Sequence, residues 1–132
     1  MRDNMGLYKG KRNPNGEWVE GNLIIFPKTK RTKIMVWEWA DLDFNAIEVR
    51  PETVGQYTGR TDKNRKRIFE GDVVRCVRTG CDGKTMVGYI VFDDCCFSVK
   101  ERKTPNQPAM DLCDDFEIIG NIHDNPELLE VK

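Results

Sequence analysis

VGQYTGRTDKNRKRIFEGDVVRCVR, residues 54–78, decides how the chain is divided. A glycine-spaced segment leads into a basic run and then, through an acidic turn, into a β-rich stretch. We interpret residues 54–59 as a connector, 60–67 as an exposed basic turn, and 68–78 as the entry to a small barrel, because β-branched residues dominate after Asp72. The stretch therefore predicts a β-rich first lobe, residues 1–55, and a barrel-forming second lobe, residues 56–132.

Turn-forming residues recur along the whole chain. Glycine, proline and asparagine leave little room for a long helix and favour short strands. Such strands, joined by tight turns, predict a mainly β fold whose second lobe closes into a small barrel. The expected strands are 17–26 with a bulge at Gly21, 34–39, 46–50 after a turn over 41–45, 73–78, 85–92, 97–100 and 116–122. One helical turn is expected after Asn125 as N-cap, with Pro126 at the first position.

Residues 34–39 fit two periodicities. Met35, Trp39 and Leu42 match helical spacing, whereas Met35, Trp37 and Trp39 match strand alternation. The strand is favoured, because tryptophan and β-branched residues suit sheets and a helix here would lack an N-cap.

Charge is balanced overall but unevenly distributed. The 132 residues contain 21 Lys and Arg against 22 Asp and Glu, so the net charge of -1 gives no argument from the whole molecule for a polyanionic partner. Residues 1–92 carry 17 basic and 12 acidic side chains, whereas residues 93–132 carry 4 and 10. This asymmetry can guide association between copies or expose one basic face.

The composition also predicts a compartment. No apolar run approaches the roughly 18 residues that a membrane span needs, and the first residues lack the apolar segment of a secretory signal. The five cysteines, an odd number, suit a reducing environment. We expect a soluble, cytoplasmic protein with no membrane partner.

The basic run RTDKNRKR, residues 60–67, is a candidate nucleic-acid contact. Phosphates would be contacted by its five cations, Arg60, Lys63, Arg65, Lys66 and Arg67. A solvated hairpin tip is the favoured alternative, because the run contains no aromatic residue on which a base could stack. A second basic tip, KTKRTK at residues 28–33, would strengthen the nucleic-acid hypothesis if both tips shared a face.

Residues able to bind a metal or catalyse a reaction are scattered. A zinc site would draw on Cys76, Cys81, Cys95, Cys96, Cys113 and His123. The spacing from Cys76 to Cys81 is longer than that of paired zinc ligands, so Cys76 and Cys113 are interpreted as buried hydrophobes and one of the pair Cys95 and Cys96 as exposed. A magnesium site would draw on Asp111, Asp114, Asp115 and Glu117, although carboxylates in polar loops usually face solvent. With His123 and Ser98 as the only histidine and serine, we expect no catalytic residues, metal or cofactor.

Several short sequence motifs occur along the chain in a characteristic order. They are GEWVEG at 16–21, VGQYTG at 54–59, DKN at 62–64, IFEGDVV at 68–74, EIIGNI at 117–122 and NPELL at 125–129. In these motifs the chain resembles the YopX family, small proteins encoded by bacteriophages and prophages. The resemblance implies an SH3-like barrel in the second lobe and brings no activity and no catalytic residues.

Two turns depart from the family pattern. Asn64-Arg65 stands where the family usually has Asn-Gly, so we expect either Asn64 to adopt the left-handed conformation or the turn type to change. Cys95-Cys96 stands at a hairpin where Asp-Gly is expected.

Three tryptophans lie in the first lobe, Trp18, Trp37 and Trp39. They either pack a thin sheet or anchor self-association, because a lobe of this size buries little surface alone. The favoured function is a non-enzymatic, oligomeric binding or adaptor protein that meets its own copies and a host or phage protein in a bacterial cytoplasm. The alternatives are nucleic-acid association through residues 60–67 and, less favoured, a metal-dependent enzyme.

Overall fold

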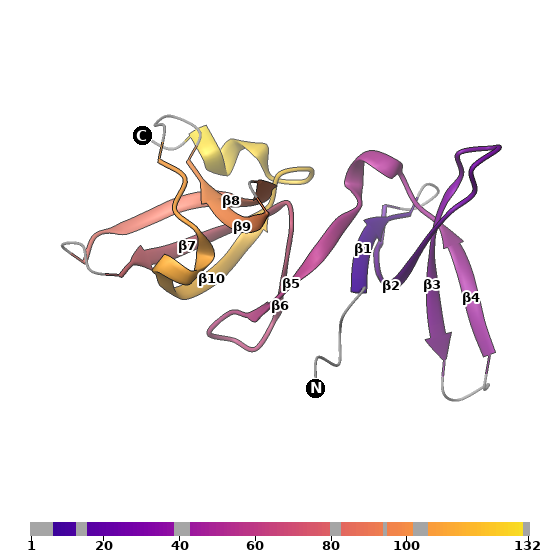
Figure 1. The fold of residues 1–132 in the computed structure, drawn as a ribbon, viewed down its shortest axis with the longest axis horizontal. Coiled ribbons are helices and arrows are strands. Elements are labelled where there is room, and N and C mark those ends of the chain that lie inside the picture. The colour runs from indigo at the N-terminus through magenta and orange to yellow at the C-terminus, as the bar shows by residue number, and fades with distance from the viewer. Residues whose placement is uncertain are drawn as a thin grey trace. The chain divides into compact units, whose positions relative to one another are not determined.

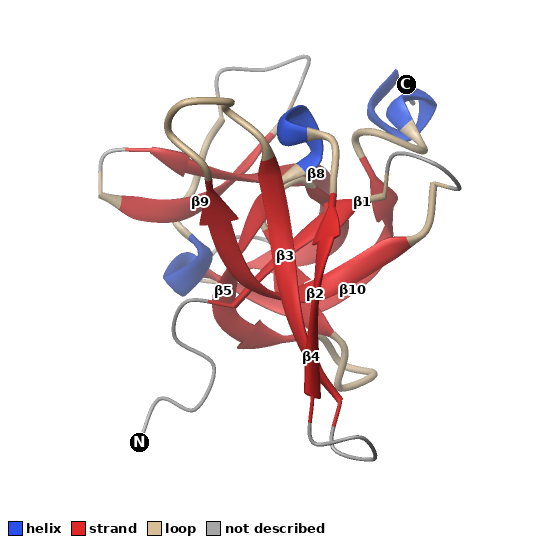
Figure 2. Ribbon diagram, turned by 90° about the vertical axis from the view of Figure 1, so that its right-hand side faces the viewer, coloured by secondary structure: helices blue, strands red, loops and turns tan. Residues whose placement is uncertain are grey.

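The computed structural model describes residues 7–12, 16–38, 43–79, 83–93, 95–101 and 106–130. This part of the chain is mainly β, as predicted (Figures 1 and 2). Its helical elements are short 3-10 helices, and the described residues contain no α-helix. The strands are β1 Leu7–Lys11, β2 Trp18–Ile25, β3 Thr32–Glu38, β4 Asp43–Glu48, β5 Gly55–Thr61, β6 Arg67–Phe69, β7 Asp72–Arg78, β8 Thr85–Asp93, β9 Cys96–Lys100 and β10 Cys113–Asn121. Three 3-10 turns complete it, η1 Pro51–Thr53, η2 Met110–Leu112 and η3 Pro126–Glu130.

The strands form two antiparallel sheets, in the orders β4-β3-β2-β1-β5-β6 and β10-β7-β8-β9. Contacts divide the chain into two compact units, residues 1–57 and residues 58–132, hereafter the first and second units. The division falls within β5, whose first residues pair with β1.

Close strand packing in the first unit explains its glycines. The predicted bulge at Gly21 is wrong, because Gly21 lies opposite Tyr8 in an unbroken register. A Cβ at Gly21 would collide with the carbonyl oxygen of Met35, and one at Gly10 would lie 2.8 Å from a methyl carbon of Val49. Glycine at these positions therefore permits close approach of neighbouring strands.

Strand predictions in the first unit were partly correct. The segment from residue 34 is a strand, β3, as predicted. The predicted turn is wrong for residues 43–45, which already pair with β3, while residues 39–42 lie outside the described residues. Strand β1 was not predicted, because Lys9, Gly10 and Lys11 give it little strand character. Its stability comes from backbone pairing with β2 and β5.

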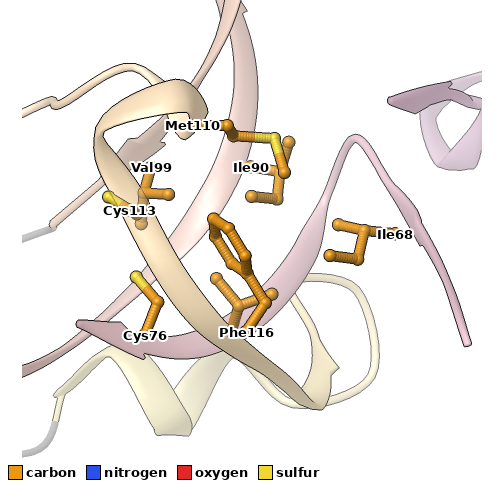
Figure 3. Close-up of a cluster of buried hydrophobic side chains, with 8 residues drawn as sticks. Ile68, Cys76, Ile90, Val99, Met110, Cys113 and Phe116 are labelled. Atoms are coloured by element: carbon orange, nitrogen blue, oxygen red, sulfur yellow. The ribbon is translucent and has the colours of Figure 1, made fainter. Parts of the chain in front are cut away.

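The second unit has a filled core. Its members are Ile68, Val74, Cys76, Ile90, Val99, Met110, Cys113 and Phe116, all buried. Figure 3 shows their side chains converging, with the Phe116 ring near the centre of the labelled group. Strand β10 is bent by register shifts between Asp114 and Glu117 and between Ile118 and Gly120. The bends let one sheet wrap around a cluster that η2 closes with Met110.

A closed barrel is not found among the described residues. In the four-stranded sheet of the second unit the edge strands are β10 and β9, and no described pairing joins these two strands. Instead, the segment before η2 occupies the edge of β9: the Val99 N–H donates to the Pro108 carbonyl at 2.9 Å, and Ser98 bridges Ala109. This segment intervenes where direct strand pairing would close a barrel.

Candidate functional site

The basic run forms a hairpin tip between β5 and β6. The Asp62 N–H donates to the Lys66 carbonyl at 2.8 Å, and the Arg65 N–H donates to the Asp62 carbonyl at 2.9 Å. Residues 60–67 are hereafter the basic hairpin. Its backbone is therefore fixed by its own hydrogen bonds.

Asp62 anchors the basic hairpin internally. This residue is 5% exposed. One carboxylate oxygen accepts the N–H groups of Asn64 at 2.8 Å and Lys66 at 2.9 Å. The other accepts the N–H of Ile118 in β10 at 3.1 Å. Burial raises the pKa of Asp62, but these backbone donors outweigh it and hold the pKa below 3.8. The negative charge therefore serves the fold and does not face solvent with the cations.

Arg65 carries the unusual backbone of this turn, with φ 65°. We expected Asn64 to adopt the left-handed conformation or the turn type to change, and the former is wrong. Arg65 itself occupies the position where glycine would be unstrained. The hydrogen bonds of Asp62 on either side hold it there.

The five cations of the basic hairpin differ in exposure, since Arg60 is partly buried and the other four are exposed. Arg60 is engaged: its guanidinium donates to the Met110 carbonyl at 2.8 Å and lies 4.7 Å from the Phe116 ring centre. Lys63 lies 3.6 Å from the Glu117 carboxylate, which Arg75 approaches at 2.9 Å. Arg65, Lys66 and Arg67 are exposed at the tip. The second basic tip, residues 28–33, belongs to the first unit.

The tryptophan prediction can be followed at Trp18. Its side chain is half-buried in β2, with the Lys9 ammonium 4.8 Å from the ring centre. The side chain of Trp37 and the whole of Trp39 lie outside the described residues. Their role as interface residues stays a prediction.

Strand register gathers apolar side chains on one face of the first unit. Val19, Leu23, Ile25, Ile34, Val36, Ile47 and Val49 share that face, hereafter the apolar face. Only Ile34 and Val49 among them are buried. Ile25 is 58% exposed, and the next residue, Phe26, is 43% exposed. Sequence reasoning missed this face because strand register cannot be read from the sequence, although Ile47 and Val49 lay in the predicted strand 46–50.

The described cysteines do not form a metal site. Cys76 and Cys113 are buried, as predicted, and burial followed by the neighbouring Cys113 raises the pKa of Cys76 to about 12. Both Cys95 and Cys96 are exposed, where exposure of one was expected, and Cys95 has φ 66° in the turn where Asp-Gly was expected. Within the described ranges no three His, Cys, Asp or Glu residues are grouped to hold a metal ion.

The proposed acidic cluster and His123 have structural partners. Asp114 accepts the Thr79 hydroxyl at 3.0 Å, and Glu117 pairs with Arg75. The N–H groups of His123 and Asp124 donate to the Asn121 side-chain oxygen at 3.0 and 2.9 Å. These residues build the end of β10 and its turn.

One shallow hollow lies on the second unit, with a volume of about 250 Å³. Arg78, Lys84, Thr85, Met86, Glu101, Asn106 and Pro108 line it. Its walls mix both charges with apolar groups, and no nucleophile with an adjacent base is among them.

The fold and these sites define a two-unit, mainly β protein organised by turns. A sequence model of the family described as YopX protein matches residues 7–130, so the chain belongs to the YopX family. No curated protein matches the chain. The motifs that carry the family resemblance build turns: Gly71, with φ 93°, accepts the Ile122 N–H at 2.9 Å, and Asp72 accepts the Phe69 N–H at 2.8 Å.

Proposed function

We propose that this protein is a non-enzymatic adaptor that associates with its own copies through the first unit and presents the apolar face to another protein. The supporting observation is the contrast in burial between the units. Among the described hydrophobic residues, two are buried in the first unit, Ile34 and Val49, against ten in the second.

A half-open apolar face favours association. A unit of this size gains little from its own small core, and exposed apolar patches typically mark interaction sites. Ile25 leaves the end of this face exposed at the end of β2. Binding of another protein at this face would bury apolar side chains that the first unit alone leaves exposed to water.

Light scattering coupled to gel filtration tests the self-association. At micromolar concentration we expect particles heavier than the 15.3 kDa chain. A monomer across that range would contradict the proposal.

A hydrophobic dye tests the apolar face. We expect Ile25→Asp to reduce dye fluorescence more than the matched change Leu112→Asp, because Leu112 is 49% exposed on η2 of the second unit. Equal reductions would contradict the assignment of the face.

A second candidate function is nucleic-acid association through the basic hairpin. It is supported by the inward-facing Asp62, which leaves Arg65, Lys66 and Arg67 exposed at the tip. Binding of DNA or RNA should weaken steeply with salt and fall when Lys66 and Arg67 become Ala. Absence of binding at low salt would end this candidate.

The proposal extends to origin and setting. We infer a phage or prophage gene, a cytoplasmic site of action in the bacterial host, and a second unit related to SH3-like barrels. The last is supported by the short, bent strands around one core. No helix in the described residues is long and apolar enough to cross a membrane. A metal-dependent enzyme is the least favoured candidate, and metal-dependent thermal stabilisation is its minimum requirement.

A further inference from the structure

The sheet of the first unit has an edge strand whose outer side is paired with no strand among the described residues. Strand β4 is the last strand in its sheet order and pairs with β3 on one side. Such an edge presents unpaired backbone N–H and C=O groups that can pair with another strand. The inference below rests on the proposed self-association and specifies its geometry.

The other sheet ends are protected. Strand β6 has only three residues. The edge of β10 is bent and receives the basic hairpin, whose Lys63 N–H donates to the Phe116 carbonyl at 2.9 Å. The edge of β9 receives residues 106–109, with the Val99 N–H donating to Pro108. Short length, bends and covering segments are the usual devices against edge pairing.

Among the described residues, strand β4 shows none of these devices. All six of its residues pair with β3 without a register shift. Its sequence, DFNAIE, contains no proline and no lysine, and its charges stand at the two ends. A straight edge of this kind is suited to pairing.

Hydrogen-bond alternation identifies the open groups. The Val49 N–H donates to the Thr32 carbonyl at 3.0 Å, so the backbone N–H and C=O groups of Val49 point toward β3. Because facing alternates along an antiparallel strand, the backbone groups of Phe44, Ala46 and Glu48 point to the open edge. Beyond β4 the edge closes, since the Arg50 N–H donates to the Lys11 carbonyl at 2.9 Å.

We propose that β4 pairs antiparallel with β4 of a second copy, about a two-fold axis at Ala46. This register places Ala46 opposite its own counterpart and Phe44 opposite Glu48 of the second copy, so every outward residue is paired and no like charges face each other. Ala46 is exposed and small, which suits the position where a side chain meets itself.

The pairing also extends the adaptor surface. A two-fold axis perpendicular to the sheet keeps the same face of both copies on one side. The apolar faces of the two copies then form one continuous surface. A second copy is therefore the occupant that serves the proposed function directly.

Two substitutions of Ala46 test the edge. Ala46→Pro removes the outward N–H, which an edge strand tolerates, and Ala46→Lys sets like charges together at the axis. We expect light scattering to show a dimer for the wild type and a monomer for both variants at the same concentration, with unchanged circular dichroism. Asn22→Lys, which adds the same charge at an exposed position of the inner strand β2, should remain a dimer.

Oxidative cross-linking tests the register. Residues in a hydrogen-bonded antiparallel pair have Cα atoms about 5.5 Å apart, which a disulfide can span. With Cys81, Cys95 and Cys96 replaced by Ser, Ala46→Cys should form a reducible covalent dimer and Asn22→Cys should not. Dimers that survive both Ala46 substitutions and resist cross-linking would overturn edge pairing while leaving self-association intact. A monomeric wild type would contradict both proposals.

Discussion

Ile68, Ile90 and Phe116 of the second unit pack into one buried cluster, whereas the described hydrophobic residues of the first unit supply only Ile34 and Val49 to its interior. Both units are built from short antiparallel strands. The difference lies in bending and cover: β10 is bulged and η2 adds Met110, while β4 is straight and ends its sheet. Strand content therefore does not decide whether a unit is complete; what covers its faces and edges does.

Truncating the second-unit core should have the largest effect. We expect Ile90→Ala to lower the free energy of unfolding by about 3 kcal/mol, because it removes buried methyl groups and leaves a cavity. The matched change Ile24→Ala, at a half-buried position of β2, should lower the free energy of unfolding by about 1 kcal/mol or less. Urea denaturation followed by circular dichroism measures both. Equal losses would remove the contrast between the units.

Removing the anchor of the basic hairpin should come next. Asp62→Ala leaves the N–H groups of Asn64, Lys66 and Ile118 without their acceptor, so we expect a loss of about 2 kcal/mol at neutral pH. Because the folded pKa of Asp62 is below its ordinary 3.8, its stabilisation is present above that pH and is lost as pH falls toward the folded pKa.

Thermal melts at pH 6 and at about pH 2.5 compare the protein with the Asp62 carboxylate ionised and with it largely protonated. The stability difference between the wild type and Asp62→Ala should be smaller at the lower pH. A difference of the same size at both values would show that the Asp62 carboxylate is not the anchor.

Sequence patterns predicted what local chemistry determines. Strand β7, the turn at Gly71, the start of η3 at Pro126 and the buried Cys76 and Cys113 follow from residue type and spacing. The resemblance to the YopX family rests on sequence motifs that form turns, and the family match over residues 7–130 confirms it.

Features set by distant partners escaped prediction. Strand β1 exists because β2 and β5 flank it, and β4 begins at Asp43 because β3 lies alongside. Gly21 reads as a bulge locally but allows approach of Met35. In the candidate site, the basic run was predicted as exposed, yet Arg60 packs on Phe116 and Asp62 reaches Ile118, partners more than fifty residues away.

Relieving the strained turn should have the smallest effect. Arg65→Gly is expected to raise the free energy of unfolding by about 0.5 kcal/mol, because glycine adopts the φ of 65° at no steric cost but gains freedom when unfolded. Lys66→Gly, at a neighbouring exposed position without positive φ, should lower stability instead. Differential scanning calorimetry measures the two shifts, and a loss for Arg65→Gly equal to that for Lys66→Gly would contradict the assigned strain.

Amide hydrogen exchange at two protein concentrations tests most directly whether a second copy completes the first unit. The N–H groups of Phe44, Ala46 and Glu48 should become more protected as concentration rises, because each gains a partner across the edge. Amides of Ile90 and Val99 in the second unit should exchange at concentration-independent rates. Protection that is equal at both concentrations throughout β4 would contradict the account.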